Sequence, residues 1–165
     1  MLTQERLKEL LCYNPLSGAW AWVSPNPNYR NGKAGEPAGG PDENGYLRIR
    51  VDGKRYRAGR LAFLYMLGYL PAEMVDHWDR DSSNDRWENL REATNSQNQA
   101  NVSARAHNKS GLKGVDFVAR IGKFRSQIRV DGRTKHLCVS KCPAVAHFAY
   151  IVAASKLYGE FARVA

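Results

Sequence analysis

The sequence predicts an α+β fold in two parts, the second a small three-stranded antiparallel sheet packed on one helix. Its 165 residues suit one ordinary domain or two small ones, and 43% hydrophobic residues can supply a core. Residues 1–102 hold 13 basic and 13 acidic side chains, whereas residues 103–165 hold 12 and 3. The whole net charge of +9 therefore lies in the second part. A basic block beside a neutral one suggests two modules, one of which meets a polyanion.

Several classes of protein are disfavoured by composition. No apolar run approaches the roughly 20 residues of a membrane span, and the first residues do not resemble a signal peptide. Three cysteines cannot all pair, and none lies in a C-x-x-C motif, which disfavours a disulfide scaffold or a four-cysteine zinc site. We therefore expect an intracellular protein with no membrane partner and no structural zinc.

Hydrophobic spacing and turn residues define the elements of the first part. In type I′ hairpin turns both central residues have positive φ, and Asp52-Gly53 is a strong signal for such a turn. In chain order we expect a helix capped by Thr3 that includes Leu7, Leu10 and Leu11, a strand at 19–23, a long irregular loop at 24–45, a hairpin at 46–57 and a helix at 60–67.

The second part follows a polar segment and repeats the same turn. Asp131-Gly132 closes a second hairpin, Pro143 suits the first turn of a helix, and Gly159 suits its end. The expected elements are a linker at 103–111, strands at 114–118, 123–130 and 134–139, and a helix at 144–158.

An acidic cluster interrupts the first part at 73–92, where seven acidic and three basic side chains give a net charge of −4. It is either a solvated loop or a site for a hard divalent cation, which prefers oxygen ligands. Asp76-His77 favours the site, because a carboxylate can bind the cation while a neutral imidazole acts as general base near pH 7.

The residues downstream of this pair carry a resemblance. Asp76-His77-Trp78-Asp79 is followed by N-D-R-W-E-N-L-R-E-A-T at 84–94 and by Asn98. This spacing resembles the branch of the HNH endonucleases found in free-standing phage and homing enzymes. The resemblance implies a ββα-metal unit, a hairpin followed by a helix, with its core motif at 75–101 and Thr94 as the cap of that helix.

What the resemblance implies is hydrolysis of phosphodiester bonds in DNA, with 5′-phosphate and 3′-hydroxyl products. It makes Asp76 and Asn98 the metal ligands, His77 the group that activates water, and Asn89 the residue that orients His77. An oxygen-only ligand set suits one Mg²⁺, or Mn²⁺, better than Zn²⁺.

Other residues around the motif are open to two interpretations. Trp78 and Trp87 are expected to be core or packing residues. This branch usually begins the preceding helix with H-R-L, whereas here Gly59 takes the place of the histidine. Four arginines could contact phosphates or be surface charges: Arg60, Arg80, Arg86 and Arg91.

The basic part resembles the apetala or ethylene-response-factor type of DNA-binding domain. The resemblance rests on N-K-S-G-x-K-G-V at 108–115, G-K-F-R-x-Q-I-R at 122–129 and Y-G-E-F-A at 158–162. In that family a three-stranded sheet lies in the major groove with the helix behind it. This part lacks the family's sheet tryptophans, and Asp116 stands where arginine is frequent, so the target sequence does not carry over.

Strand alternation indicates which side chains of this sheet would meet DNA. Arg125, Gln127 and Arg129 share one face, and Arg and Gln can read guanine and adenine edges. His136 lies on the Gln127 face or is an ordinary surface residue. Further basic residues are expected at phosphates: Lys113, Arg120, Lys123, Arg133 and Lys135.

The sequence thus predicts a nuclease domain at 1–102, a linker at 103–111 and a DNA-binding domain at 112–165. The leading function is a metal-dependent endonuclease acting on double-stranded DNA in the cytoplasm of a bacterial or phage-infected cell. The alternative is a sequence-specific DNA-binding regulator with a vestigial nuclease half, which Gly59 favours. Cleavage of RNA is disfavoured because the major groove of RNA is narrow. Nicking by a monomer, double-strand cleavage by a homodimer, and a role in homing, phage competition or restriction all stay open.

Overall fold

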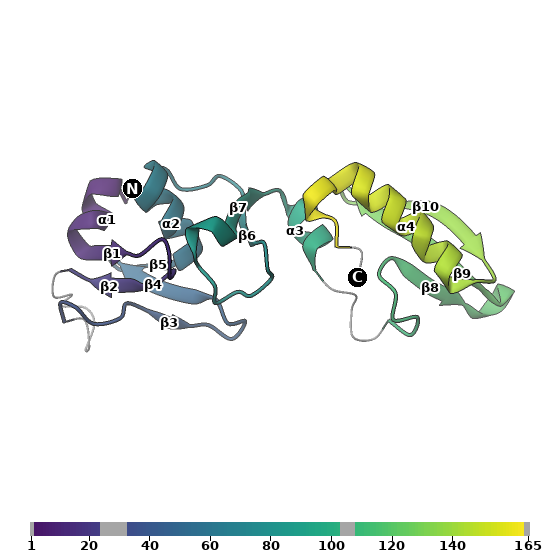
Figure 1. Ribbon diagram of the computed structural model, residues 1–165, viewed down its shortest axis with the longest axis horizontal. Helices are drawn as coiled ribbons and strands as arrows, with labels where there is room; N and C mark the ends of the chain where they lie inside the picture. The colour runs from purple at the N-terminus through teal and green to yellow at the C-terminus, as the bar shows by residue number, and fades with distance from the viewer. Residues whose placement is uncertain (1, 24–32, 103–107, 164–165) are drawn as a thin grey trace. The chain divides into compact units, whose positions relative to one another are not determined.

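The computed structural model describes residues 2–23, 33–102 and 108–163, and these form two compact units, residues 1–92 and 93–165 (Figure 1). Each unit combines helices with small sheets, so the predicted α+β class is confirmed. Over the described ranges, no helix has both the length and the apolar character needed to cross a membrane.

In its described residues, 2–23 and 33–92, the first unit contains three small sheets and two α-helices. β1 pairs with β2, β4 lies between β3 and β5, and β6 pairs with β7. The elements are α1 (Gln4–Leu10), β1 (Leu11–Tyr13), β2 (Trp20–Trp22), β3 (Gly40–Pro41), β4 (Leu47–Val51), β5 (Lys54–Arg57), α2 (Ala58–Leu67), β6 (Met74–His77), the 3₁₀ turn η1 (Trp87–Asn89) and β7 (Leu90–Ala93).

The first helix ends one residue earlier than its hydrophobic spacing predicts. The Thr3 hydroxyl accepts a hydrogen bond from the Arg6 backbone, as expected of an N-cap. Leu11 is extended and pairs with Trp22 across β1 and β2. Leu11 is fully buried, and its pairing with β2, a tertiary contact that the sequence does not reveal, decides where the helix stops.

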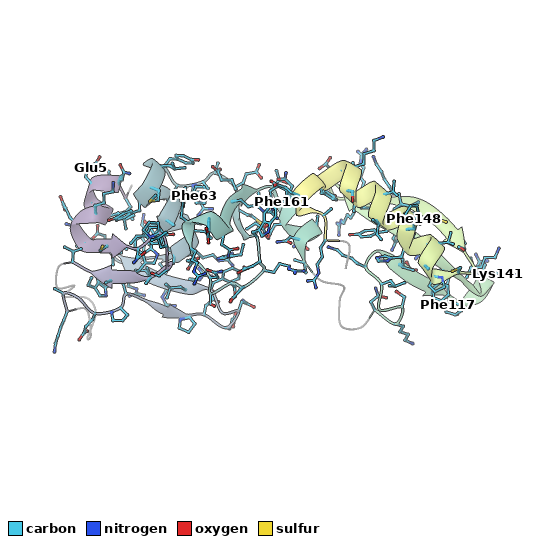
Figure 2. All side chains as sticks on the ribbon, in the orientation of Figure 1. Glu5, Phe63, Phe117, Lys141, Phe148 and Phe161 are labelled. Carbon is cyan, nitrogen blue, oxygen red and sulfur yellow. The ribbon has the colours of Figure 1, made fainter. Side chains whose placement is uncertain are left out.

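The hairpin of β4 and β5 leads directly into α2. Asp52 and Gly53 both have positive φ, which confirms the type I′ turn. Helix α2 begins at Ala58, two residues before its predicted start, and ends at Gly68 in the left-handed conformation. Its buried face and the inner face of β4 build one core with α1, β1 and β2. Phe63 lies in this core (Figure 2).

The long segment at 24–45 is only partly irregular. Residues 24–32 lie outside the described residues. In the described remainder, Pro37 bridges to Ala21, and Gly40–Pro41 forms β3 beside β4. The sequence does not predict this edge strand, because two prolines and two neighbouring glycines are atypical of strands.

The second unit contains one sheet of three strands in the order β10-β9-β8, with α4 packed on it. The strands are antiparallel, and Asp131 and Gly132 again have positive φ. The elements are α3 (Asn95–Asn101), β8 (Val115–Val118), η2 (Ala119–Ile121), β9 (Lys123–Val130), β10 (Arg133–Ser140), α4 (Pro143–Tyr158) and η3 (Gly159–Phe161).

The packing of α4 depends on small residues. Ala146 and Ala154 of α4 are fully buried, and so is Ser126 of β9. Because these side chains are small, the helix and the sheet approach closely. Tyr150 fills the space that Gly114 leaves, because a Cβ on Gly114 would lie 2.0 Å from the Tyr150 ring. The opposite face of α4 keeps Phe148 exposed (Figure 2).

The predicted domain boundary near residue 102 stays a prediction, and five residues of the predicted linker, 103–107, lie outside the described residues. The compact units meet between Glu92 and Ala93, at the end of β7. Helix α3 packs against α4 and η3, and the Arg163 backbone donates a hydrogen bond of 3.1 Å to the Ala100 carbonyl. These contacts group α3 with the second unit.

We predict that Gly114→Ala destabilises the second unit more than Gly111→Ala. Both glycines have positive φ, which costs an L-residue about 1–2 kcal/mol. Nothing lies within 4 Å of a Cβ on Gly111, whereas one on Gly114 meets Tyr150 and adds about 1–3 kcal/mol of overpacking. Hydrogen exchange of the β9 amides in the full chain measures both changes, and equal losses of protection would contradict the close contact.

Candidate functional site

Strand β6 carries Asp76 and His77 into the interior of the first unit. The strand becomes progressively buried, with Met74 and Val75 half-buried and both Asp76 and His77 buried. Burying a carboxylate or an imidazole without a hydrogen-bond partner costs free energy, so both side chains need specific contacts. The structure supplies a different partner for each.

His77 pairs with Asp85, a residue that sequence analysis did not single out. The imidazole Nε2 lies 3.0 Å from Asp85 Oδ1, and the two side chains are only 6% and 3% exposed. Burial raises the pKa of the Asp85 carboxyl, while the hydrogen bond and charge of His77 lower it. Burial is the larger effect, so the pKa of Asp85 lies above its ordinary value. With Asp85 ionised, the carboxylate can only accept, and Nε2–H is then the donor.

The segment 13–18 holds the backbone of Asp85 in place. The Tyr13 hydroxyl donates a hydrogen bond of 2.6 Å to the Asp85 carbonyl, and burial raises the pKa of Tyr13 far above its ordinary value. The Trp87 backbone donates to the Pro15 carbonyl at 2.9 Å. Gly18, with φ of +76°, lies so close that a Cβ would be 2.6 Å from the Asp85 carbonyl carbon. The Y-N-P-x-S-G sequence therefore supports the partner of His77.

Gly59 provides the room for this carboxylate. It is buried in the first turn of α2, and a Cβ there would lie 3.1 Å from Asp85 Oδ1. A histidine at this position would compete with Asp85 for the same space. The departure from H-R-L thus coincides with a carboxylate placed against His77.

Asn89 fixes the loop that connects His77 to Asp85. Its side-chain oxygen accepts from the Asp79 backbone at 2.9 Å, and its amide donates to Asp79 Oδ1 at 2.9 Å and to the Asn84 carbonyl at 2.8 Å. Its backbone carbonyl accepts from the Trp78 backbone at 2.9 Å. These contacts tie the residue after His77 to the residue before Asp85, as expected of a residue that orients His77.

Asp76 is paired with Arg91 from β7. Both the Nε and Nη2 atoms of Arg91 lie 2.9 Å from Asp76 Oδ2. The same guanidinium lies 4.5 Å from the centroid of the Trp78 ring. Trp78 is not a core residue, because its side chain is 55% exposed, and it packs instead against neighbours such as Arg91. Trp87 does pack against the core, with its ring 4.9 Å from Phe63.

The second predicted metal ligand, Asn98, lies on α3 in the second unit. Thr94 and Gln97 form a complete capping box at the start of this helix, which confirms Thr94 as its N-cap. Within the described parts of the chain, no three His, Cys, Asp or Glu side chains gather as a metal cluster. Carboxylate and amide oxygens are the ligand types that Mg²⁺ accepts, and the roles of Asp76 and Asn98 as ligands stay a prediction.

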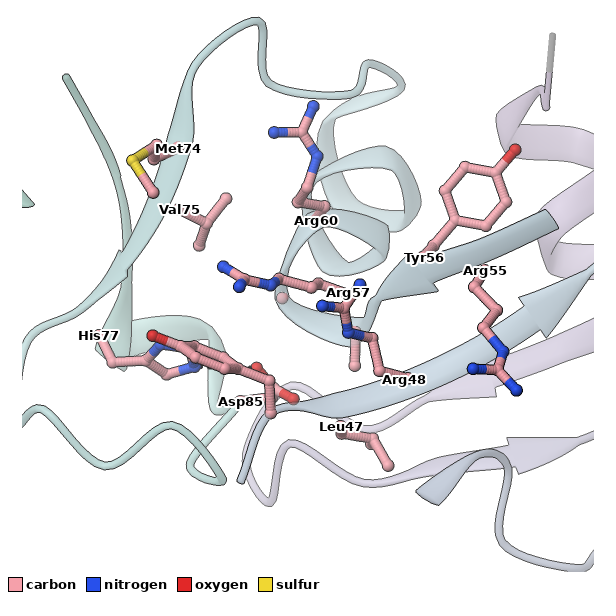
Figure 3. Close-up of a pocket in the computed structure, with 13 residues that line it drawn as sticks. Leu47, Arg48, Arg55, Tyr56, Arg57, Arg60, Met74, Val75, His77 and Asp85 are labelled. Carbon is pink, nitrogen blue, oxygen red and sulfur yellow. Dashed lines mark hydrogen bonds and ion pairs between the residues drawn. The ribbon is translucent and has the colours of Figure 1, made fainter. Parts of the chain in front are cut away.

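A pocket of about 400 Å³ opens beside His77 (Figure 3). Its lining includes His77 and Asp85, Tyr46, and four arginines, Arg48, Arg55, Arg57 and Arg60. Of these four, only Arg60 is predicted from the sequence as a possible phosphate contact. The Arg60 guanidinium donates to the carbonyls of Pro71 and Glu73, so it also fixes the chain that leads into β6.

The predicted DNA-binding residues of the second unit lie on two faces of its sheet. Arg125, Gln127 and Arg129 share the face away from α4, and the register places His136 opposite Gln127 on that face. Arg125 pairs with Asp116 at 2.7 Å, so Asp116 neutralises one of the two arginines on this face. Arg133 and Lys135 are opposite Val130 and Ile128, on the other face.

Two further predicted phosphate contacts, Arg120 and Lys123, lie at the turn from η2 into β9. The Lys113 ammonium donates to the carbonyls of Ala100 and Val102 at the end of α3, where a cation is favourable. Lys113 therefore has a structural role in the second unit. Its interaction with phosphate stays a prediction.

Asn89→Ala should lower the free energy of unfolding of the first unit by about 2–3 kcal/mol, because three side-chain hydrogen bonds of a buried amide are lost. Asn84→Ala is the matched control, since it removes two exposed hydrogen bonds, one donated to Asp79 and one accepted from the Arg86 backbone. All four tryptophans lie in residues 1–92, so their fluorescence during urea unfolding monitors this unit. Equal effects of the two substitutions would show that Asn89 does not hold the loop.

Comparison with known proteins identifies one matching family. Residues 56–100, from within β5 to within α3, match the family model described as HNH endonuclease. No curated protein and no solved structure matches the chain. The matched segment contains Asp76, His77, Asp85, Asn89 and Asn98. The match supports nuclease activity of the HNH type for the part of the chain that carries the His77–Asp85 pair.

Proposed function

We propose that the chain is a metal-dependent endonuclease that hydrolyses phosphodiester bonds in double-stranded DNA. The observation that carries this proposal is the buried His77–Asp85 pair inside the segment that matches the HNH endonuclease model. A buried imidazole that is held by a carboxylate and opens onto an arginine-lined pocket suits proton transfer beside a phosphate.

In the proposed reaction His77 is the general base. With Nε2 donating to Asp85, the imidazole uses Nδ1 to take a proton from water as the water oxygen attacks phosphorus. The bond from phosphorus to the 3′-oxygen breaks, and that oxygen takes a proton from solvent. The products are a 5′-phosphate and a 3′-hydroxyl. Asp85 stabilises the imidazolium that forms, as carboxylates do for catalytic histidines elsewhere.

The divalent cation would be held by Asp76 and Asn98. When bound, a Mg²⁺ or Mn²⁺ ion stabilises the charge that develops on the phosphate and the leaving oxygen. Arg91 holds the Asp76 carboxylate in place through contacts of 2.9 Å. Asn89 orients His77 through the loop at 77–85.

The second unit is proposed to bind the major groove through the sheet face of Arg125, Gln127 and Arg129. Support comes from the net charge of +9 in residues 103–165 and from the register that places these side chains on one face. We place the activity in the cytoplasm of a bacterial or phage-infected cell.

His77→Ala should lower the rate of plasmid cleavage by about 10²–10⁴-fold, the usual contribution of a general base. Nicking of supercoiled plasmid with Mg²⁺, and its loss with EDTA, measures the activity. Cleavage unaffected by the substitution would overturn the role of His77. Tight DNA binding without cleavage by either protein would favour the alternative, a regulator with a vestigial nuclease half.

Asp85→Asn should lower kcat by roughly 10–100-fold, less than removal of the base itself. The loss arises because the imidazolium formed during proton transfer loses its buried counter-charge. Asp81→Asn is the control, since it removes an exposed carboxylate from the same loop. Equal kcat values for Asp85→Asn and Asp81→Asn would contradict this role of Asp85.

A further inference from the structure

The first unit has no net charge, but its basic and acidic side chains lie in separate segments. Residues 48–60 contain six basic side chains and only one acidic side chain, Asp52. The acidic cluster at 73–92 offsets this excess in the sum. The basic segment forms β4, β5 and the first turn of α2, so its charges are fixed on a hairpin.

Four arginines of this hairpin lie on one face. Arg48 is opposite Arg57 and Arg50 is opposite Arg55 in the register of β4 and β5, while Ile49 and Val51 point to the core. We call Arg48, Arg50, Arg55 and Arg57 the arginine face. Same-face neighbours along a strand are about 6.8 Å apart, and directly opposite side chains are closer.

This arrangement is unfavourable for the hairpin itself, because like charges directly opposite each other destabilise a sheet. Arg48 is offset by Asp42, whose carboxylate lies 2.8 Å from its Nε atom. In the described parts of the chain, Arg50, Arg55 and Arg57 form no ion pair. Stability of the hairpin therefore gives no reason for these three charges, whereas a polyanionic ligand does.

The arginine face continues into the pocket beside His77. Arg48, Arg55 and Arg57 line this pocket together with His77 and Asp85. The Arg57 guanidinium lies 4.1 Å from the Tyr46 ring centroid, and the Tyr46 and His77 ring centroids are 5.7 Å apart. Figure 3 shows the Arg57 side chain directed towards the His77 end of the pocket. Stacking on Tyr46 holds the guanidinium in place before any ligand arrives.

We infer that the arginine face binds the backbone phosphates of the DNA strand on one side of the scissile phosphate, with Arg57 at the phosphate nearest His77. This inference rests on the proposed function. Guanidinium groups bind phosphate oxygens in a bidentate manner, and a row of such contacts fixes the position of a strand without reading its sequence. The first unit would then position its own substrate, in addition to any binding by the second unit.

The test measures DNA binding by the full chain in a His77→Ala background, so it does not depend on cleavage. The affinities of Arg57→Gln and Lys54→Gln for a random-sequence duplex are measured over a range of KCl concentrations. Alternation places Lys54 on the face of Ile49 and Val51, so it carries the same charge on the same hairpin but off the arginine face. We expect Arg57→Gln to reduce the slope of log K against log salt by about 0.9, the value of one phosphate contact, and Lys54→Gln to leave it unchanged.

A second measurement places the contact beside the reaction. With His77 intact, Arg57→Gln should lower kcat/KM for plasmid cleavage by about 10- to 100-fold, the usual value of a hydrogen bond to a charged group, and Arg57→Lys should restore only part of it. Equal salt slopes for Arg57→Gln and Lys54→Gln would overturn the inference. Absence of cleavage by the unsubstituted protein would overturn the proposed function, while the salt slopes would still decide whether the arginine face binds DNA.

Discussion

The buried contact between His77 Nε2 and Asp85 Oδ1 is the interaction on which the first unit depends most. An imidazole and a carboxylate are tolerated in the interior because each satisfies the other. The segment 13–18 supports the Asp85 backbone, Gly59 leaves space for its carboxylate, and Asn89 closes the loop between the two partners. Segments from four parts of the chain are thus arranged around a single hydrogen bond.

Charge in this unit is separated, and the separation has chemical consequences. The arginine face concentrates positive charge in the pocket beside His77, and Asp85 from the acidic cluster lines the same pocket. Net charge influences solubility and association with partners, whereas the chemistry of a site depends on the position of each charged side chain.

Local rules account for most of the elements that the sequence predicts correctly. Both D-G turns, the caps by Thr3 and Thr94, and the three strands of the second unit depend on residues close in sequence. The failures have tertiary causes. Leu11 leaves the first helix to pair with Trp22, β3 exists only because β4 offers an edge, and Trp78 is exposed although aromatic residues of its size are usually buried.

The sequence by itself determined the α+β class, the split of charge between the two parts, and the spacing of Asp76, His77, Asn89 and Asn98, because these are properties of residue order and composition. The tertiary structure alone decided that Asp85 is the partner of His77, that Gly59 makes this possible, and that Arg57 reaches the same pocket. The physical reason is that hydrogen bonds and pockets join residues far apart in sequence. Periodicity and turn chemistry act only over a few residues.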